Sequence, residues 1–308
     1  MNFLGVEIGG TKLQVVCGTA DGRITDRQRF IVDRGAGGEG IRTQLATAIP
    51  ALIARHTPRA IGVGFGGPVD WRTGRIACSH QISGWQDFEL GEWMHEQFGL
   101  PVRVDNDANV AALGEARCGS GRGYSPVFWI NMGSGVGGGL VVDGRIYHGT
   151  TPGEAEIGHV CLDKSGTRVE HRCSGWAVDR RIREAVALHP NSPLGQLVEG
   201  RTGGEARALG PALAAGDELA HAILSELADN LAFALSHVVQ LFHPQRIVVG
   251  GGLSLVGEPL RDAIAAALPQ YVMDTFQPGP AVVLAGLAED SVPVGALVLA
   301  SDASEGLR

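Results

Sequence analysis

The sequence contains one chain pattern twice, and this repeat constrains the fold more than any other feature. A β-like run meets a glycine turn, continues in a second run and reaches a third run after an Asp-Gly pair. The first copy begins at Leu4 with its pair at Asp21, and the second begins at Val127 with its pair at Asp143. Asp-Gly between β-like runs is a strong hairpin signal, because glycine accepts the positive φ of a tight turn. The repeat predicts two antiparallel meanders, as a duplicated domain would have.

After each meander, helical and β-like segments alternate. Apolar residues at helical spacing indicate helices over 41–56 (with Pro50 kinking it), 90–98, 108–117, 174–188, 217–242, 258–268 and 294–301. Short apolar runs indicate strands over 60–65, 102–104, 246–249 and 281–284. This alternation implies parallel strands with covered faces. We predict a two-domain α/β protein, with a small domain over 1–118, a large one over 119–293, and the last helix, about 294–308, packing back on the first.

Composition narrows the class of protein. A length of 308 residues suits two domains, and 44% hydrophobic residues with 46 glycines suit a turn-rich globular chain. The formal charge of −8, without a basic cluster, argues against a nucleic-acid partner. No unbroken apolar run has the length of a membrane span, and a strand at the N-terminus argues against a signal peptide. Five scattered cysteines suit free thiols in a reducing cytoplasm.

Asn106 and Asp107 lie where a predicted strand passes into a predicted helix. Asn and Asp at such a junction are ordinary helix N-caps, and taken alone we would interpret them so. The chain also has glycine turns starting at Gly9 and Gly133, and a Glu-Ile-Gly-His segment starting at Glu156. Glycine turns let backbone N–H groups approach phosphate oxygens closely. Phosphate-binding turns with one well-placed carboxylate suggest phosphoryl transfer to a hydroxyl group.

Six motifs in order resemble those of the ROK family, which groups repressors, open reading frames and sugar kinases. They are Glu7-Ile-Gly-Gly-Thr-Lys, Gly66-Gly-Pro, Asp105-Asn-Asp-Ala-Asn, Gly133-Ser-Gly-Val-Gly-Gly-Gly, Glu156-Ile-Gly-His and Val249-Gly-Gly-Gly. The resemblance implies the actin-like ATPase (ribonuclease H-like) fold, with a sugar and ATP in the cleft between two domains, Mg²⁺ as metal, and a homodimer. Repressor members carry a helix-turn-helix domain before the first strand. This sequence begins at that strand and therefore resembles the kinases.

The resemblance and the glycine turns together assign a set of nucleotide-binding residues. These are Gly9, Gly10, Thr11, Lys12, Gly133, Ser134, Gly135, Gly251 and Gly252. Glu7 stands where the family usually has Asp, which keeps a carboxylate near Mg²⁺ one methylene further out.

On the acceptor side, the resemblance implies that Asp107 is the general base for the attacking hydroxyl. The implied sugar-binding residues are Gly67, Gln81, Asn106, Asp107, Glu156, His159 and Glu170. Carboxylates suit a polyol because each can bind two adjacent hydroxyls. Family members often have Asn near Gln81, so Gln81 is expected to alter sugar selectivity.

The chain departs from the family at its zinc motif. Family members follow the Glu-x-Gly-His segment with Cys-x-Cys-Gly-x-x-Gly-Cys-x-Glu, whose cysteines bind a structural zinc with the motif histidine. Here the cysteine loop is shortened, while its terminal Glu remains as Glu170. His159, Cys161, His171 and Cys173 offer a tetrahedral donor set. Small buried thiols are the commoner role for such cysteines, so we expect no zinc.

The sequence thus predicts an ATP-dependent hexokinase acting on glucose at its 6-hydroxyl. Fructose, mannose or an N-acetylated hexosamine as acceptor, and polyphosphate as donor, stay open as alternatives. So does a sugar-sensing regulator without catalysis, although the intact Asp107 argues against it.

Overall fold

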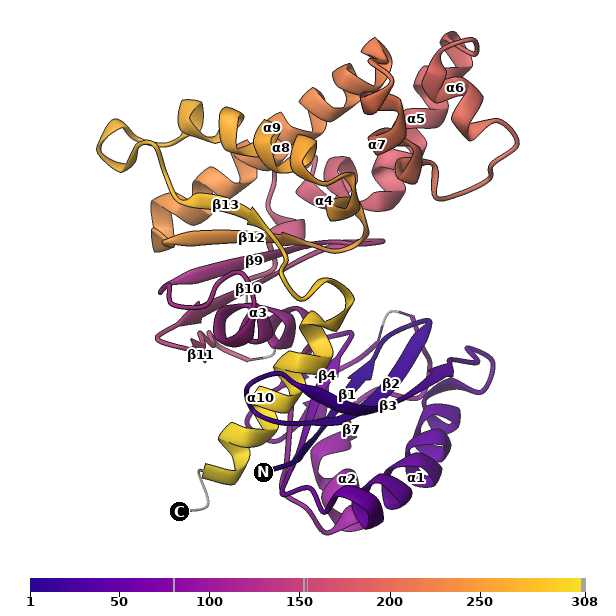
Figure 1. The fold of residues 1–308 in the computed structure, drawn as a ribbon, viewed down its shortest axis with the longest axis vertical. Coiled ribbons are helices and arrows are strands. Elements are labelled where there is room, and N and C mark those ends of the chain that lie inside the picture. Colours follow the sequence, from indigo (N-terminus) through magenta and orange to yellow (C-terminus); the bar gives the residue numbers. More distant parts are fainter. Residues whose placement is uncertain (80, 152, 154, 306–308) are drawn as a thin grey trace. The chain divides into compact units, whose positions relative to one another are not determined.

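The computed structural model describes residues 1–79, 81–151, 153 and 155–305 (Figure 1). The chain divides into two compact units. The first contains residues 1–123, 139–155 and the chain from Gly286 onward, and the second contains residues 124–138 and 156–285. The chain therefore passes between the units more than once, and each unit is described by itself below.

The first unit is built on a five-stranded sheet with the order β3-β2-β1-β4-β8. Its strands are β1 (Phe3–Ile8), β2 (Lys12–Gly18), β3 (Ile24–Ile31), β4 (Ile61–Phe65) and β8 (Val102–Asn106). The first three pair antiparallel, with Val6 opposite Val15, while β1, β4 and β8 run parallel, with Val63 opposite both Val6 and Val104. The predicted first meander and the parallel pairing after it are confirmed.

Helices and a small second sheet complete the first unit. The helices are α1 (Gly37–His56), α2 (Leu90–Phe98), α3 (Asp107–Cys118) and α10 (Ser291–Glu305), and the short strands are β5 (Val69–Asp70), β6 (Arg75–Ile76) and β7 (Phe88–Glu89). α10 packs against α3, β1 and β4. The helices approach closely where Gly114 faces Gly295, because a methyl group on Gly295 would lie 1.8 Å from the Val110 carbonyl oxygen.

The other five-stranded sheet has the order β11-β10-β9-β12-β13. Its strands are β9 (Val127–Met132), β10 (Val136–Val142), β11 (Arg145–Ile146), β12 (Arg246–Gly250) and β13 (Ala281–Leu284). β12 pairs parallel with both β9 and β13, and β10 pairs antiparallel with β11. The second meander is therefore present, but its third strand has only two residues. β10 runs across the division between the two units.

The second unit contains the helices α4 (Val169–Cys173), α5 (Gly175–Leu188), α6 (Pro193–Val198), α7 (Leu209–Ala214), α8 (Glu218–Phe242) and α9 (Glu258–Ala267). α9 contacts β13 and packs against α8 (Figure 1). Short 3₁₀ turns cover Ile157–His159, Glu205–Ala208, Gly252–Val256, Leu268–Tyr271, Asp274–Phe276 and, in the first unit, Ala288–Asp290. The segment expected to be one helix from Ser174 is preceded by the separate α4, because Ser174 has an extended backbone and caps α5.

Helix α8 is long and apolar enough to cross a membrane by length and composition alone. In the structure, 61% of its most apolar window is buried. It packs against α4, α5, α7 and α9, which is the environment of a core helix.

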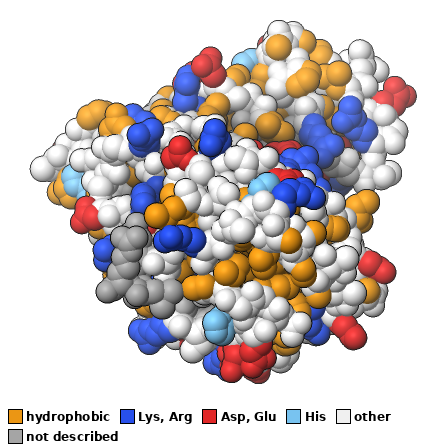
Figure 2. Space-filling view, turned by 60° about the horizontal axis from the view of Figure 1, so that its bottom comes forward, with side chains coloured by type: hydrophobic (Ala, Val, Ile, Leu, Met, Phe, Trp, Pro, Cys, Tyr) orange, Lys and Arg blue, Asp and Glu red, His pale blue; other side chains and the backbone are white. Residues whose placement is uncertain are grey.

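On the face drawn in Figure 2, acidic and basic side chains are interspersed.

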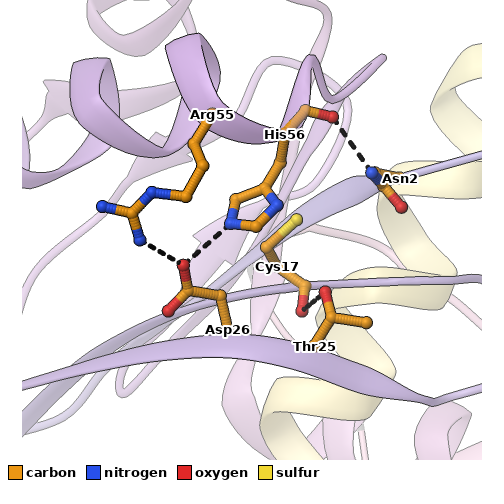
Figure 3. A network of polar contacts seen from close by, with 6 residues as sticks. All are labelled: Asn2, Cys17, Thr25, Asp26, Arg55 and His56. Atoms are coloured by element: carbon orange, nitrogen blue, oxygen red, sulfur yellow. Dashed lines mark hydrogen bonds and ion pairs between the residues drawn. The ribbon is translucent and has the colours of Figure 1, made fainter.

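A polar cluster ties the end of α1 to β3 (Figure 3). Arg55 Nη1 and His56 Nε2 each lie 2.7 Å from Asp26 Oδ2, and Asn2 donates to the carbonyl oxygen of His56 at 3.0 Å. The hydrogen bond from His56, with that from Arg55, holds the pKa of Asp26 below its usual value of 3.8 despite partial burial. The cluster therefore stabilises the folded state most when Asp26 is ionised.

We predict that Asp26→Asn lowers the free energy of unfolding at pH 7 by about 1 kcal/mol, since the charged acceptor is lost. Because the folded pKa is depressed, the contribution is present above pH 3.8 and disappears as the pH falls through the lower, folded value. Urea titrations of both proteins should show the difference shrinking below that pH. A difference that is constant down to strongly acidic pH would contradict the assignment.

Candidate active site

The junction between β8 and α3 places the first group of predicted residues. Asn106 is the N-cap of α3, and its Oδ1 accepts from Ala108 N at 2.9 Å. Its Nδ2 donates to the Gly67 carbonyl oxygen at 3.0 Å. The ordinary N-cap interpretation of Asn106 is therefore correct. The same side chain also brings the Gly66-Gly67 turn to the start of α3.

Asp107 is the first residue of α3 and faces this turn. A methyl group placed on Gly66 would lie 3.4 Å from Asp107 Oδ2. The free N–H groups of the first helical turn favour a negative charge at this position. Gly66 presents no side chain toward this carboxylate, which is the group predicted to act as the general base.

The turn between β1 and β2 holds the second group. Gly9 N donates to Lys12 O at 2.9 Å, which closes the turn. Lys12 Nζ lies 3.3 Å from Glu7 Oε2, and Gln14 Nε2 also donates to that oxygen. The predicted Mg²⁺ neighbour Glu7 is thus paired with the predicted nucleotide contact Lys12. Both contacts fall on one carboxylate oxygen, and the other could accept from a water bound to Mg²⁺.

Gln81 lies over Gly10. A methyl group on Gly10 would come within 1.7 Å of Gln81 Oε1, so a larger residue at position 10 would displace this side chain. The structure therefore places the residue expected to affect sugar selectivity against a residue expected to bind nucleotide. Thr11 is exposed beside them.

In the second unit, Glu170 of α4 contacts the glycine turn between β9 and β10. Its Oε2 accepts from Val136 N at 2.9 Å, and a methyl group on Gly135 would lie 2.5 Å from that oxygen. The turn is closed by Gly133 N donating to Gly135 O at 3.0 Å, and Gly175 N donates to Gly133 O at 2.8 Å. The predicted sugar contact Glu170 is therefore bonded to the predicted phosphate turn, which the sequence did not indicate.

Glu156 precedes the 3₁₀ turn Ile157–His159 and His159 ends it, and both side chains are exposed. His159 Nδ1 lies 3.0 Å from Arg168 Nη1. An arginine can only donate, so Nδ1 accepts and a neutral His159 carries its proton on Nε2. Sequence reasoning gave Arg168 no role, and nothing in the local pattern distinguishes it from a surface arginine.

The four candidate zinc ligands, which are His159, Cys161, His171 and Cys173, each contact other groups or lie apart from the rest. Among the described residues, no group of three or more His, Cys, Asp or Glu side chains is placed to hold a metal. His171 Nδ1 accepts from Arg168 N at 3.2 Å, and Cys161 is exposed. Burial raises the pKa of Cys173 to about 12. Because the described donors are not gathered around a common point, this set as it stands does not fit a zinc site.

Gly251 and Gly252 follow β12. Gly251 has φ +83°, and a methyl group there would lie 2.5 Å from Asn131 Oδ1 and 2.6 Å from the Met132 backbone, so the residue is constrained to glycine. A methyl group on Gly252 would meet nothing within 4 Å. The contact of Gly252 with a nucleotide stays a prediction. Ser134, in the glycine turn between β9 and β10, is exposed.

Asp105, His148 and Trp71 were given no role by the sequence, and they form a cluster at the β8–α3 junction. Asp105 is 3% exposed, and its Oδ2 lies 2.6 Å from His148 Nε2. The ring of His148 stacks on Trp71. Asp105 belongs to the quoted motif, so its position was visible in the sequence. His148 lies 43 residues away, and no local pattern connects the two.

Comparisons with known proteins agree on one family. The model of the ROK family matches residues 3–303. A glucokinase of Halalkalibacterium halodurans is 32% identical, covering 95% of this chain and 93% of the relative, and a glucokinase of Thermotoga maritima is 29% identical over 96% of each. A ROK family glucokinase of Streptomyces griseus, solved with glucose and AMPPNP, is 30% identical, covers 98% of this chain and 100% of that one, and has a TM-score of 0.85. The expected actin-like fold is confirmed.

The zinc content stays a prediction that elemental analysis can test. Because Cys173 is buried as a thiol and His159 contacts Arg168, we expect much less than one zinc per chain after dialysis. Treatment with a chelator, followed by addition of Mg²⁺, should leave activity unchanged. About one zinc per chain, lost in His159→Ala, would contradict the prediction.

Proposed function

Since the chain belongs to the ROK family, we propose that it transfers the γ-phosphoryl group of ATP to the 6-hydroxyl of glucose. The protein is a sugar kinase, and the choice of glucose and of ATP is supported by the glucokinases to which it is similar. The observation that carries the proposal is the position of Asp107. This carboxylate stands at a helix N-terminus, beside Gly66, which presents no side chain toward it.

The proposed chemistry needs positioning and charge neutralisation more than covalent help from the protein. Asn106 would bind a hydroxyl of the hexose through its amide, which the capping bond to Ala108 and the bond to Gly67 hold in place. Asp107 would accept the proton of the attacking hydroxyl. Glu156 and His159 would bind further ring hydroxyls, His159 donating from Nε2.

The backbone N–H groups of the glycine turns would bind the phosphates. Glu170 contributes to this arrangement through its bond with Val136 N. Glu7 would hold the hydration shell of Mg²⁺, which neutralises phosphate charge when bound with ATP. We place the reaction in the cytoplasm, because all five cysteines are free thiols.

Glu170 has two proposed functions, binding the sugar and holding the glycine turn through Val136 N, and two substitutions distinguish them. Glu170→Gln keeps an oxygen that can accept from Val136 N, whereas Glu170→Ala removes it. We expect Glu170→Gln to raise the KM for the sugar about tenfold, the cost of weakening a charge-assisted hydrogen bond, while the KM for ATP stays unchanged. Glu170→Ala should raise both KM values, because the glycine turn also loses its acceptor.

Steady-state kinetics with each substrate varied in turn would measure these effects. An unchanged sugar KM in both variants would show that Glu170 does not bind the sugar. An ATP KM that rises equally in both would show that the amide oxygen introduced by Glu170→Gln does not hold the glycine turn as the carboxylate does.

The proposed function is tested by ADP release over a panel of hexoses, with ATP and polyphosphate compared as donors. We expect the highest kcat/KM for glucose with ATP. Asp107→Asn keeps the shape and removes the proton acceptor, so kcat should fall by about 10²–10⁴-fold. Glucose binding measured by calorimetry should change far less, because an amide still bonds the hydroxyl. Near-normal turnover in Asp107→Asn would show that Asp107 is not the base.

A further inference from the structure

Asp105 is a buried carboxylate with both of its oxygens bonded. Its Oδ1 accepts from Asn106 N at 2.8 Å and from Asn109 Nδ2 at 3.0 Å, and its Oδ2 lies 2.6 Å from His148 Nε2. The residue is 3% exposed. A carboxylate enclosed in this way is not available to a substrate. Any effect it has on the reaction must pass through the groups it binds.

Those groups lie on both sides of Asp107. Asn106 precedes it as the N-cap of α3, and Asn109, which is 2% exposed, follows it within the first helical turn. Asp105 therefore connects the end of β8 with the first turn of α3. The orientation of the carboxylate of Asp107 depends on the geometry of this turn.

His148 is the partner that fixes Asp105 from the other side. Among the described residues, Nε2 of His148 is the only polar contact of Asp105 Oδ2. A carboxylate accepts and does not donate, so Nε2 of His148 carries a proton. A buried carboxylate without such a donor would be costly and would turn or take up a proton.

The ring of His148 is itself held in place. It stacks on Trp71, with ring centroids 4.1 Å apart and planes inclined by 15°. Trp71 follows β5, and the guanidinium of Arg72 lies 5.4 Å from the centre of its ring. The indole Nε1 of Trp71 is buried and has no hydrogen-bond partner within the described part of the chain, so the contribution of Trp71 is packing.

We propose that His148 is a positioning residue for phosphoryl transfer, acting through Asp105 on the first turn of α3 and hence on Asp107. The inference rests on the proposed function, in which Asp107 is the base. His148 lies just after β11, and its side chain is 17% exposed. The proposed effect on the reaction is indirect and requires no contact between His148 and the substrate. Asn106 is also held by Gly67 and Ala108, so hexose binding depends less on His148 than the proton transfer does.

Two substitutions separate the hydrogen bond from the ring stacking. His148→Phe keeps an aromatic ring against Trp71 and removes the donor, whereas His148→Gln loses the stacking and keeps an N–H near the position of Nε2. We expect His148→Phe to lower kcat by about tenfold or more, as a small misplacement of a reacting group can do. The KM for glucose should change by less than about threefold, and His148→Gln should restore most of kcat. Equal losses in both variants, or none in His148→Phe, would overturn the proposal.

A double-mutant cycle tests the route of action. In the Asp107→Asn background, His148→Phe should cause no further fall in kcat, because the group it positions has lost its function. If Asp107→Asn alone left kcat unchanged, the proposed base would be wrong, and this route with it. If Asp107→Asn shows its expected loss but the His148→Phe loss is undiminished in that background, the inference alone is wrong.

A spectroscopic measurement on the unsubstituted protein tests the hydrogen bond itself, with His148→Gln used only to assign the resonances. Histidine labelled with ¹⁵N should show, for the resonances lost in His148→Gln, a protonated Nε2. A neutral His148 protonated only at Nδ1 would overturn the proposal, since Nε2 could not then donate to Asp105.

Discussion

The first unit depends most on the hydrogen bonds that the buried carboxylate of Glu115 accepts. Glu115 lies in the last turn of α3. Glu115 is fully buried, and its Oε2 accepts from Ser120 N at 2.9 Å and Gly286 N at 3.0 Å. Its Oε1 accepts from Leu287 N at 2.8 Å and Ser291 Oγ at 2.9 Å. The chain first leaves the first unit shortly after Ser120, and its last return to that unit is at Gly286. One carboxylate thus fixes the departing and the returning segment to the same helix, and losing a buried acceptor of this kind would leave several N–H groups unpaired.

Helix α3 carries this anchor at one end and Asp107 at the other. Eight residues separate Asp107 from Glu115, which is about 12 Å along a helix. The close approach of α3 and α10 at Gly114 and Gly295 keeps the helix against its neighbour along that length. The position of the proposed base is therefore set from both ends: by Glu115 and the packing of α10 at one end, and by Asp105 at the other.

Patterns that are local in the chain could be predicted well. The two Asp-Gly hairpins, the alternation of strands and helices, and the junction at Asn106 all depend on neighbouring residues, and the structure has each of them. The side-chain contacts at the site could not be predicted, because they join distant segments. Glu170 and Val136 are 34 residues apart, and His148 and Asp105 are 43 apart. Whether two such residues come into contact depends on how the segments between them fold. The period of apolar residues predicts secondary structure and does not predict these long-range contacts.

The capping and the binding interpretations of Asn106 are compatible, and this explains why an amide suits the position. An amide side chain has two N–H donors and two acceptor lone pairs. Asn106 gives one donor to Gly67 O and one lone pair to Ala108 N, which leaves one of each unused among the described residues. A hydroxyl needs one donor and one acceptor to be bound at both its lone pair and its proton. The cap bonds therefore do not compete with a sugar for Asn106. They hold the remaining donor and acceptor in a fixed direction, next to the carboxylate that we propose as the base.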